Sequence, residues 1–197
     1  MSNQKKRQRP VLRDNDFKNS GLNNSIHRMA NHVATEWLSI PGIRVADLFY
    51  APICDIAQFE MAKVLKYAIE NMIAANRSIL SEKDITTATK TNMSMYDQFP
   101  RTRCAEVSND DNKNNPIYPD CHFFAKQPFY RLAVQLAQQH VADIKFGKKA
   151  MLLLQQYIEY FFLTRIKLSI LAALHERRTT LLPRDLELVL EILDHCN

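Results

Sequence analysis

The chain has 197 residues, of which 46% are hydrophobic and 24% are charged, and it contains only three glycines. So few glycines argue against the Gly-rich phosphate loops of nucleotide-binding α/β folds, and the composition is typical of a globular helical protein. The net charge of +5 permits a polyanionic partner without requiring one.

The first half of the sequence predicts a long helix between two short ones. An amphipathic helix is expected at about 25–38, and a long helix is expected from Pro52 to about residue 76. A short helix then opens at Ser81, with Asp84 in its first turn, where a negative charge suits the helix dipole. Basic residues lie in the two loops between these helices.

The second half predicts the same order of elements. A helix is expected from Pro128 to about residue 141, a long helix at about 148–176, and a last helix from Pro183 to about residue 194. The long helix is apolar nearly all round, so we expect it to be covered on several sides.

The two halves are copies of one unit. Residues 43–85 recur without a gap 101 residues later, so that Arg44 corresponds to Lys145 and Leu80 to Leu181. An arginine seven residues before an aspartate also occurs in both copies, as Arg77 with Asp84 and Arg178 with Asp185. The repeat predicts two matching helical halves, each unable to bury its apolar face alone.

The remaining segments are polar. Residues 1–20 predict a short basic disordered tail, which we interpret as an arm for nucleic acid rather than as a simple aid to solubility. Residues 93–124 predict a connector, because their centre at 109–116 has little means of building a core. The expected domains are therefore 21–92 and 125–197.

The cysteines lack the paired spacing of a structural zinc site, and Cys121 with His122 is only a weak metal pattern beside Cys104. We expect free thiols, no metal and no cofactor. The longest apolar run, 151–174, contains three charged residues and predicts no membrane span. The polar, basic start predicts no secretion signal.

The second half closely resembles eukaryotic histone three at residues 128–132, 137–138, 143–146 and 175–185. The first half resembles histone four at residues 43–45, 48–50, 75–77 and 83–85, with a few extra residues around 33–40. A histone four-like half fused ahead of a histone three-like half, almost without tails, is similar to the histone doublets of giant viruses such as the marseilleviruses.

This resemblance implies an all-α protein made of two histone folds in tandem, which pair as an intramolecular handshake heterodimer. It also implies a DNA-packaging protein, not an enzyme, that wraps double-stranded DNA non-specifically in a nucleosome-like particle and compacts a viral genome. The location implied is the virion and either the viral factory or the host nucleus, with no secretion and no membrane partner.

The resemblance also implies which residues meet DNA. Antiparallel pairing of the two copies would bring Arg44 toward Arg178 and Thr180, and Lys145 toward Arg77. In the family these paired loops hold phosphates, and residues like Arg44 and Lys145 enter the minor groove. The full DNA-binding set that we expect is Arg28, Arg44, Arg77, Lys126, Arg131, Lys145, Lys148, Lys149, Arg178 and Thr180. Missing basic residues near 31, 76 and 125 predict looser wrapping than in the family.

Two further partners are implied. A second copy of the chain would join through the histone three-like ends, where we expect His175, Arg178, Asp185, Leu188 and Ile192 to make the contact. The histone four-like ends would bind a doublet resembling histones two-B and two-A. The alternative is a histone-fold subunit of a transcription-factor complex, but such subunits often lack a groove-entering basic residue in one partner, and both copies here keep one.

Overall fold

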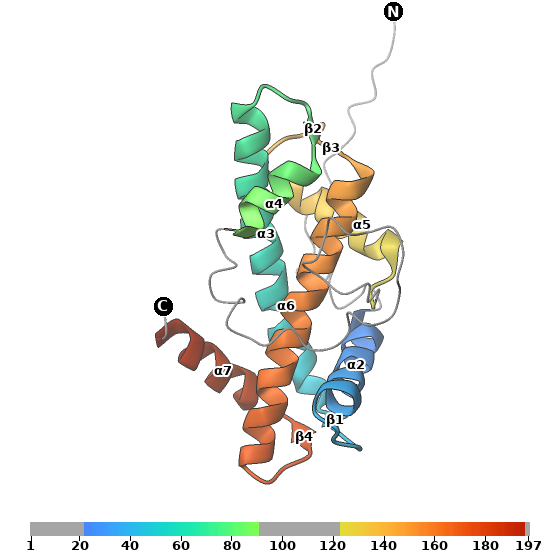
Figure 1. Cartoon of the computed structure of the whole chain (residues 1–197), viewed down its shortest axis with the longest axis vertical. Helices are drawn as coiled ribbons and strands as arrows, with labels where there is room; N and C mark the ends of the chain where they lie inside the picture. Colours follow the sequence, from blue (N-terminus) through green and yellow to red (C-terminus); the bar gives the residue numbers. More distant parts are fainter. Residues whose placement is uncertain (1–21, 91–122, 196–197) are drawn as a thin grey trace, which may run out of the picture.

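The computed structural model describes residues 22–90 and 123–195, which form two helical halves (Figure 1). The expected tail and most of the expected connector lie outside these residues. In the first half the elements are α2 (Leu22–His32), the π-helical turn η1 (Val33–Trp37), β1 (Arg44–Val45), the 3₁₀ turn η2 (Asp47–Phe49), α3 (Tyr50–Ala74), β2 (Ile79–Leu80) and α4 (Glu82–Lys90).

The second half has the same order without the two extra turns. Its elements are α5 (Lys126–Ala137), β3 (Lys145–Phe146), α6 (Lys148–His175), β4 (Thr180–Leu181) and α7 (Pro183–His195). Pro183 occupies the first position of its helix as expected, because a proline there loses no helical hydrogen bond. The expected start at Pro52 was wrong by two residues, since the preceding 3₁₀ turn leads directly into Tyr50. The expected helix at 128–141 instead begins at Lys126 and ends at Ala137.

The extra residues of the first half are absorbed next to α2. The N–H of Leu38 donates to the carbonyl of Val33 at 3.1 Å, and the N–H of Ile40 donates to that of Ala34 at 2.8 Å. The first bond spans five residues, as in a π-helix, and the second spans six, so the chain here winds more widely than in an α-helix. Ser39 then adopts a φ of +56° and ends the helical segment.

The two long helices run in opposite directions and cross at the centre of the molecule (Figure 1). Each shorter helix at the start of a half packs against the long helix of the other half, α2 on α6 and α5 on α3. α4 contacts both α3 and α6. The expectation that α6 is covered on several sides is confirmed, because its buried residues lie all round the helix. Neither half therefore closes a core by itself.

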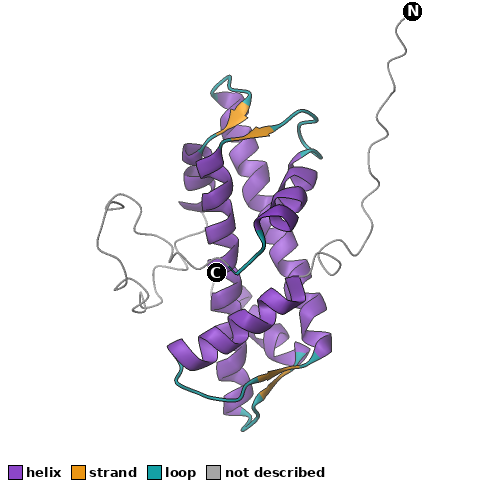
Figure 2. Ribbon diagram, turned by 90° about the vertical axis from the view of Figure 1, so that its right-hand side faces the viewer, coloured by secondary structure: helices purple, strands orange, loops and turns teal. Residues whose placement is uncertain are grey.

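The loops of the two halves meet at opposite ends of the molecule (Figure 2). At one end β1 pairs in parallel with β4, and Arg44 lies opposite Thr180. At the other end β2 pairs in parallel with β3, and Ile79 lies opposite Lys145. Each end thus joins the first loop of one half to the second loop of the other.

No helix in the described part of the chain is long and apolar enough to cross a membrane. The apolar core is continuous through both halves. It includes Phe124, which is 3% exposed although the sequence places it in the connector. The end of that segment is therefore part of the packed structure.

Candidate nucleic-acid interface

The β1–β4 end holds the Arg44 side chain out in solvent. The N–H of Arg44 donates to the carbonyl of Thr179 at 2.9 Å, and the N–H of Ala46 donates to that of Leu181 at 3.1 Å. These bonds fix the backbone on both sides of Val45, while the side chain of Arg44 remains exposed. The arginine is thus an exposed charge on a fixed backbone, next to the loop of the other half.

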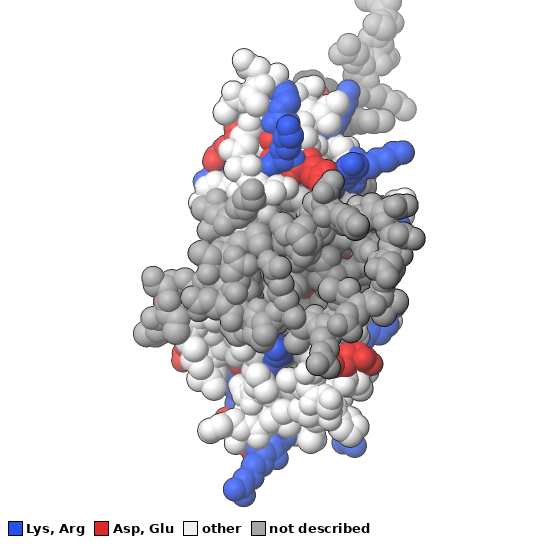
Figure 3. Space-filling view, in the orientation of Figure 1, with Lys and Arg blue, Asp and Glu red and all other residues white. Residues whose placement is uncertain are grey.

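The β2–β3 end repeats this arrangement with Lys145. The N–H of Gly147 donates to the carbonyl of Leu80 at 2.9 Å, and Lys145 lies opposite Ile79, two residues after Arg77. Lys148 and Lys149 follow at the start of α6, and all three lysines are exposed. In the space-filling view, Lys and Arg side chains project at both ends of the molecule (Figure 3).

Arg77 is held by the first turn of α4. Its NH1 donates to both Ser81 Oγ and Asp84 Oδ2 at 2.8 Å, and its NH2 pairs with Asp84 Oδ1 at 2.5 Å. The N–H of Ser81 also donates to Asp84, so the carboxylate caps the helix. Burial raises the pKa of the Asp84 carboxyl, but the bonds from Arg77 and Ser81 outweigh it and hold that pKa below its ordinary value.

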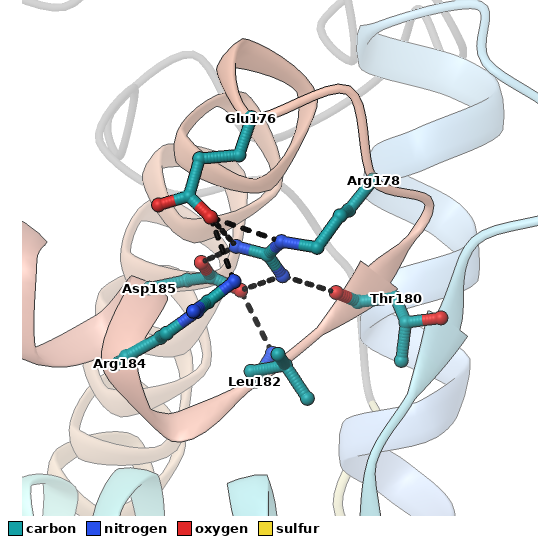
Figure 4. A network of polar contacts seen from close by, with 6 residues as sticks. All are labelled: Glu176, Arg178, Thr180, Leu182, Arg184 and Asp185. Atoms are coloured by element: carbon teal, nitrogen blue, oxygen red, sulfur yellow. Dashed lines mark hydrogen bonds and ion pairs between the residues drawn. The ribbon is translucent and has the colours of Figure 1, made fainter.

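Arg178 occupies the corresponding place before α7 but has more partners (Figure 4). Its NH2 pairs with Asp185 Oδ1 at 2.6 Å, and its NH1 donates to the carbonyl of Thr180 at 3.0 Å. Its Nε and NH2 also donate to Glu176 Oε2, at 3.1 and 2.8 Å. Hydrogen bonds to Asp185 and Glu176 raise the pKa of Arg178. The same oxygen of Glu176 accepts a bond from Arg184 at 2.8 Å.

Arg28 makes an intramolecular contact that the sequence did not predict. Its NH2 donates to the carbonyl of Phe123, which also accepts a bond from Ser25 Oγ at 2.9 Å. The side chain is exposed, but its guanidinium already donates a hydrogen bond to Phe123, at the end of the expected connector. Its assignment to DNA stays a prediction.

A buried polar pair on α6 holds the next residue of that segment. The N–H of Phe124 donates to Glu159 Oε1 at 2.9 Å, and Gln155 Nε2 donates to the carbonyl of Phe124 at 3.1 Å and to the same Glu159 oxygen at 2.9 Å. Glu159 is 1% exposed and Gln155 is 3% exposed. Together with Ser25 and Arg28, they clamp Phe123–Phe124 between α2 and α6.

The remaining predicted residues divide by exposure. Lys126 and Arg131 are exposed on α5. Of the residues expected at the contact with a second copy, His175, Leu188 and Ile192 are exposed, whereas Asp185 is 2% exposed and bonded to Arg178 and to the N–H of Leu182. Exposed Leu171, on the C-terminal part of α6, adds to the apolar surface of this end of the chain.

Comparisons with known proteins agree with this architecture. The family model of the core histone domain, which covers histones two-A, two-B, three and four, matches residues 107–192. The crystal structure of the histone from Methanopyrus kandleri is similar to this chain with a TM-score of 0.50 and 14% sequence identity, over 83% of this chain and 88% of that chain. The chain has a histone fold.

Sequence reasoning about this histone-fold chain missed two groups of residues. The clamp was signalled by Gln155 and Glu159, which lie four residues apart in an otherwise apolar helix and therefore share one face. The Glu176–Arg184 contact was signalled by the repeat itself, since the position that corresponds to Glu176 in the first half is Ala75. Where one copy has a charged residue and the other copy does not, a partner for that charge is expected nearby.

Proposed function

We propose that this chain is a DNA-packaging histone doublet, in which a histone four-like fold (21–92) and a histone three-like fold (125–197) pair within one chain. The exchange of short helices between α3 and α6 supports this pairing, because each half supplies the cover that the other needs. The similarity to the Methanopyrus kandleri histone also supports it, since a match over 83% of the chain extends beyond residues 107–192 into the first half.

The observation that carries the DNA-binding proposal is the placement of an exposed basic residue at each strand pair, Arg44 beside Thr180 and Lys145 beside Ile79. Two matching cationic sites at opposite ends of one packed core suit a polyanion that runs along the molecule. Their partners would be phosphates and sugars, with the two long side chains reaching into the minor groove. Such contacts hold DNA without selecting a sequence.

The test is a double substitution, Arg44→Ala with Lys145→Ala, measured on several unrelated duplexes over a range of salt concentrations. We expect weaker binding by a similar factor on every duplex, and a slope of log K against log salt reduced by about two, since two phosphate contacts are removed. The matched control is Lys63→Ala with Lys66→Ala, which removes the same charge from the middle of α3. Equal effects of the two double variants would contradict the assignment. A strong preference of the wild type for one short motif would instead favour a transcription-factor subunit.

We further propose that two copies join through the end formed by α7 and the C-terminal part of α6. Leu171 and Leu188 are each 43% exposed and Ile192 is 53% exposed, which is apolar surface available for an isologous contact. His175 lies beside it, while Arg178 and Asp185 would contribute through the ion pair that they already form. The variant with His175→Glu and Leu188→Glu should bind DNA as a single doublet but protect a shorter fragment from nuclease, because it places like charges at the axis. An unchanged fragment length would contradict this interface.

The other parts of the proposal rest on the resemblance to marseillevirus doublets. The histone four-like ends would bind a doublet resembling histones two-B and two-A, and the resulting particle would compact a viral genome in the virion and in the viral factory or host nucleus. Fractionation of infected cells followed by nuclease digestion would test the location and the compaction of DNA, since the protein should co-fractionate with nuclease-protected DNA.

A further inference from the structure

Glu176 lies within the cationic site that includes Arg178 and Arg184. Its Oε2 accepts hydrogen bonds from Arg178 Nε, Arg178 NH2 and Arg184 NH2, at 2.8–3.1 Å (Figure 4). One carboxylate oxygen thus occupies three donors of two arginines. These are the donors that an approaching phosphate oxygen would use, because guanidinium groups bind carboxylates and phosphates with the same geometry.

All three guanidinium nitrogens of Arg178 donate hydrogen bonds within the free protein. NH1 donates to Thr180 and Asp185, NH2 to Asp185 and Glu176, and Nε to Glu176. The Asp185 contacts are buried and help to hold α7, whereas Glu176 and Arg184 are about half exposed, at 45% and 57%. The Glu176 contacts are therefore the ones that a ligand from solvent can replace.

The first half provides an internal comparison for this contact. Its corresponding cap position is Ala75, whose backbone angles (φ −88°, ψ +10°) match those of Glu176 (φ −83°, ψ +12°). The residues that follow, Asn76 and Arg177, have matching φ values of +51° and +58°. Within the described residues, Arg77 bonds only to Ser81 and Asp84, through NH1 and NH2, and its side chain is 38% exposed against 21% for Arg178.

We propose that Glu176 is an internal competitor for phosphate, which occupies Arg178 and Arg184 in the free protein and must be displaced when DNA binds at the β1–β4 end. This inference rests on the proposed DNA-binding function and adds an asymmetry to it. The β2–β3 end offers Arg77 with no glutamate at the corresponding cap, so it binds phosphate more tightly than the β1–β4 end. DNA is released first from the end that contains Glu176.

The experiment exchanges the two cap residues and measures binding to a short mixed-sequence duplex at several salt concentrations. Glu176→Ala should tighten binding about two- to fivefold, the range expected for freeing a partly exposed ion pair. It should also steepen the salt dependence, because more counterions are released when more phosphates are contacted. Ala75→Glu should weaken binding by a similar factor and make the salt dependence shallower. The matched control is Glu187→Ala, which removes an exposed carboxylate from α7 outside this network.

The possible outcomes separate this inference from the proposed function. If Glu176→Ala and Glu187→Ala tighten binding equally with the same salt slope, only net charge matters and the competition is wrong, although DNA binding stands. If Glu176→Ala lowers the unfolding temperature but leaves the salt slope unchanged, Glu176 is only structural and the proposal is also wrong. If the wild type and every variant fail to bind the duplex at low salt, the proposed function itself fails.

Discussion

The two halves of the molecule end their long helices with the same backbone turn, which the same kind of ion pair holds. In each, the long helix ends at a residue with positive φ, and an arginine one position later returns to a buried aspartate in the next helix. The aspartate also accepts the N–H of the residue before that helix, Ser81 in one half and Leu182 in the other. Both turns therefore share the arginine–aspartate pair, whereas the residues around it differ.

The halves differ inside their long helices. At the positions that correspond to Gln155 and Glu159 of α6, α3 has Cys54 and Gln58. The α6 pair is buried and bonded to the backbone of Phe124, at the start of the described part of the second half. In the second half these two residues form a polar anchor for the segment that leads into it.

The largest effect is expected at the buried aspartates. Asp84→Ala should lower the free energy of unfolding by about 3 kcal/mol, because it removes a helix cap and leaves Arg77 without its charged partner. Asp185→Ala should cost less, about 2 kcal/mol, since Glu176 still pairs with Arg178. Urea unfolding of both variants measures the difference. A larger loss for Asp185→Ala would show that Glu176 does not support Arg178.

The Asp84 pair should also make stability depend on pH. The pKa of Asp84 is lowered in the folded protein, so folding favours its ionised form. The stabilisation is therefore fully present above the unfolded-state pKa of about 3.9 and is lost as the pH falls through the lower folded-state value. Wild type and Asp84→Asn, unfolded in urea from neutral to acid pH, should differ most at neutral pH and converge as the pH falls through the folded-state pKa of Asp84. A constant difference would contradict this assignment.

The buried polar anchor should come next. Glu159→Ala should destabilise the protein by about 2 kcal/mol, because it removes the acceptor of the Phe124 N–H and one of the two acceptors of the Gln155 amide. The corresponding substitution in the first half, Gln58→Ala, should cost less than about 1 kcal/mol at a half-buried site. Thermal unfolding compares the two, and Glu159→Gln, which keeps an acceptor oxygen, should fall between them. Similar losses for both alanine variants would mean that the anchor adds nothing.

The smallest effect is expected at the residues with positive φ. Arg177→Gly should raise the free energy of unfolding by about 0.5 kcal/mol, since glycine adopts a φ of +58° without a steric cost. Asn76→Gly should change it by less, because asparagine tolerates this conformation better than arginine does. Chemical unfolding of the two variants under the same conditions measures the difference between their free energies of unfolding. A loss in Arg177→Gly would indicate that its side chain contributes a contact.

Much of the fold follows from local patterns in the sequence. The alternation of short and long helices, the loops between them and the repeated arginine–aspartate spacing depend on residues close together in the chain, and the structure has all of them. The positions of Arg44 beside Thr180 and of Lys145 near Arg77 depended on the resemblance, which supplied the antiparallel pairing. Helix ends were less predictable, because a 3₁₀ turn or an extra helical residue costs little free energy.

By itself, the sequence determined the helices, the repeat and the charged turn residues, since hydrophobic periodicity, capping and short-range ion pairing act within a few residues. Only the tertiary structure decided which partners the other polar groups take. Ser25 bonds to Phe123 across 98 positions and Phe124 to Glu159 across 35, while Glu176 reaches Arg184 only because the turn folds α7 back toward the end of α6. Such contacts depend on how the two halves pack, because each buried polar group must find a partner among the groups that packing brings within reach.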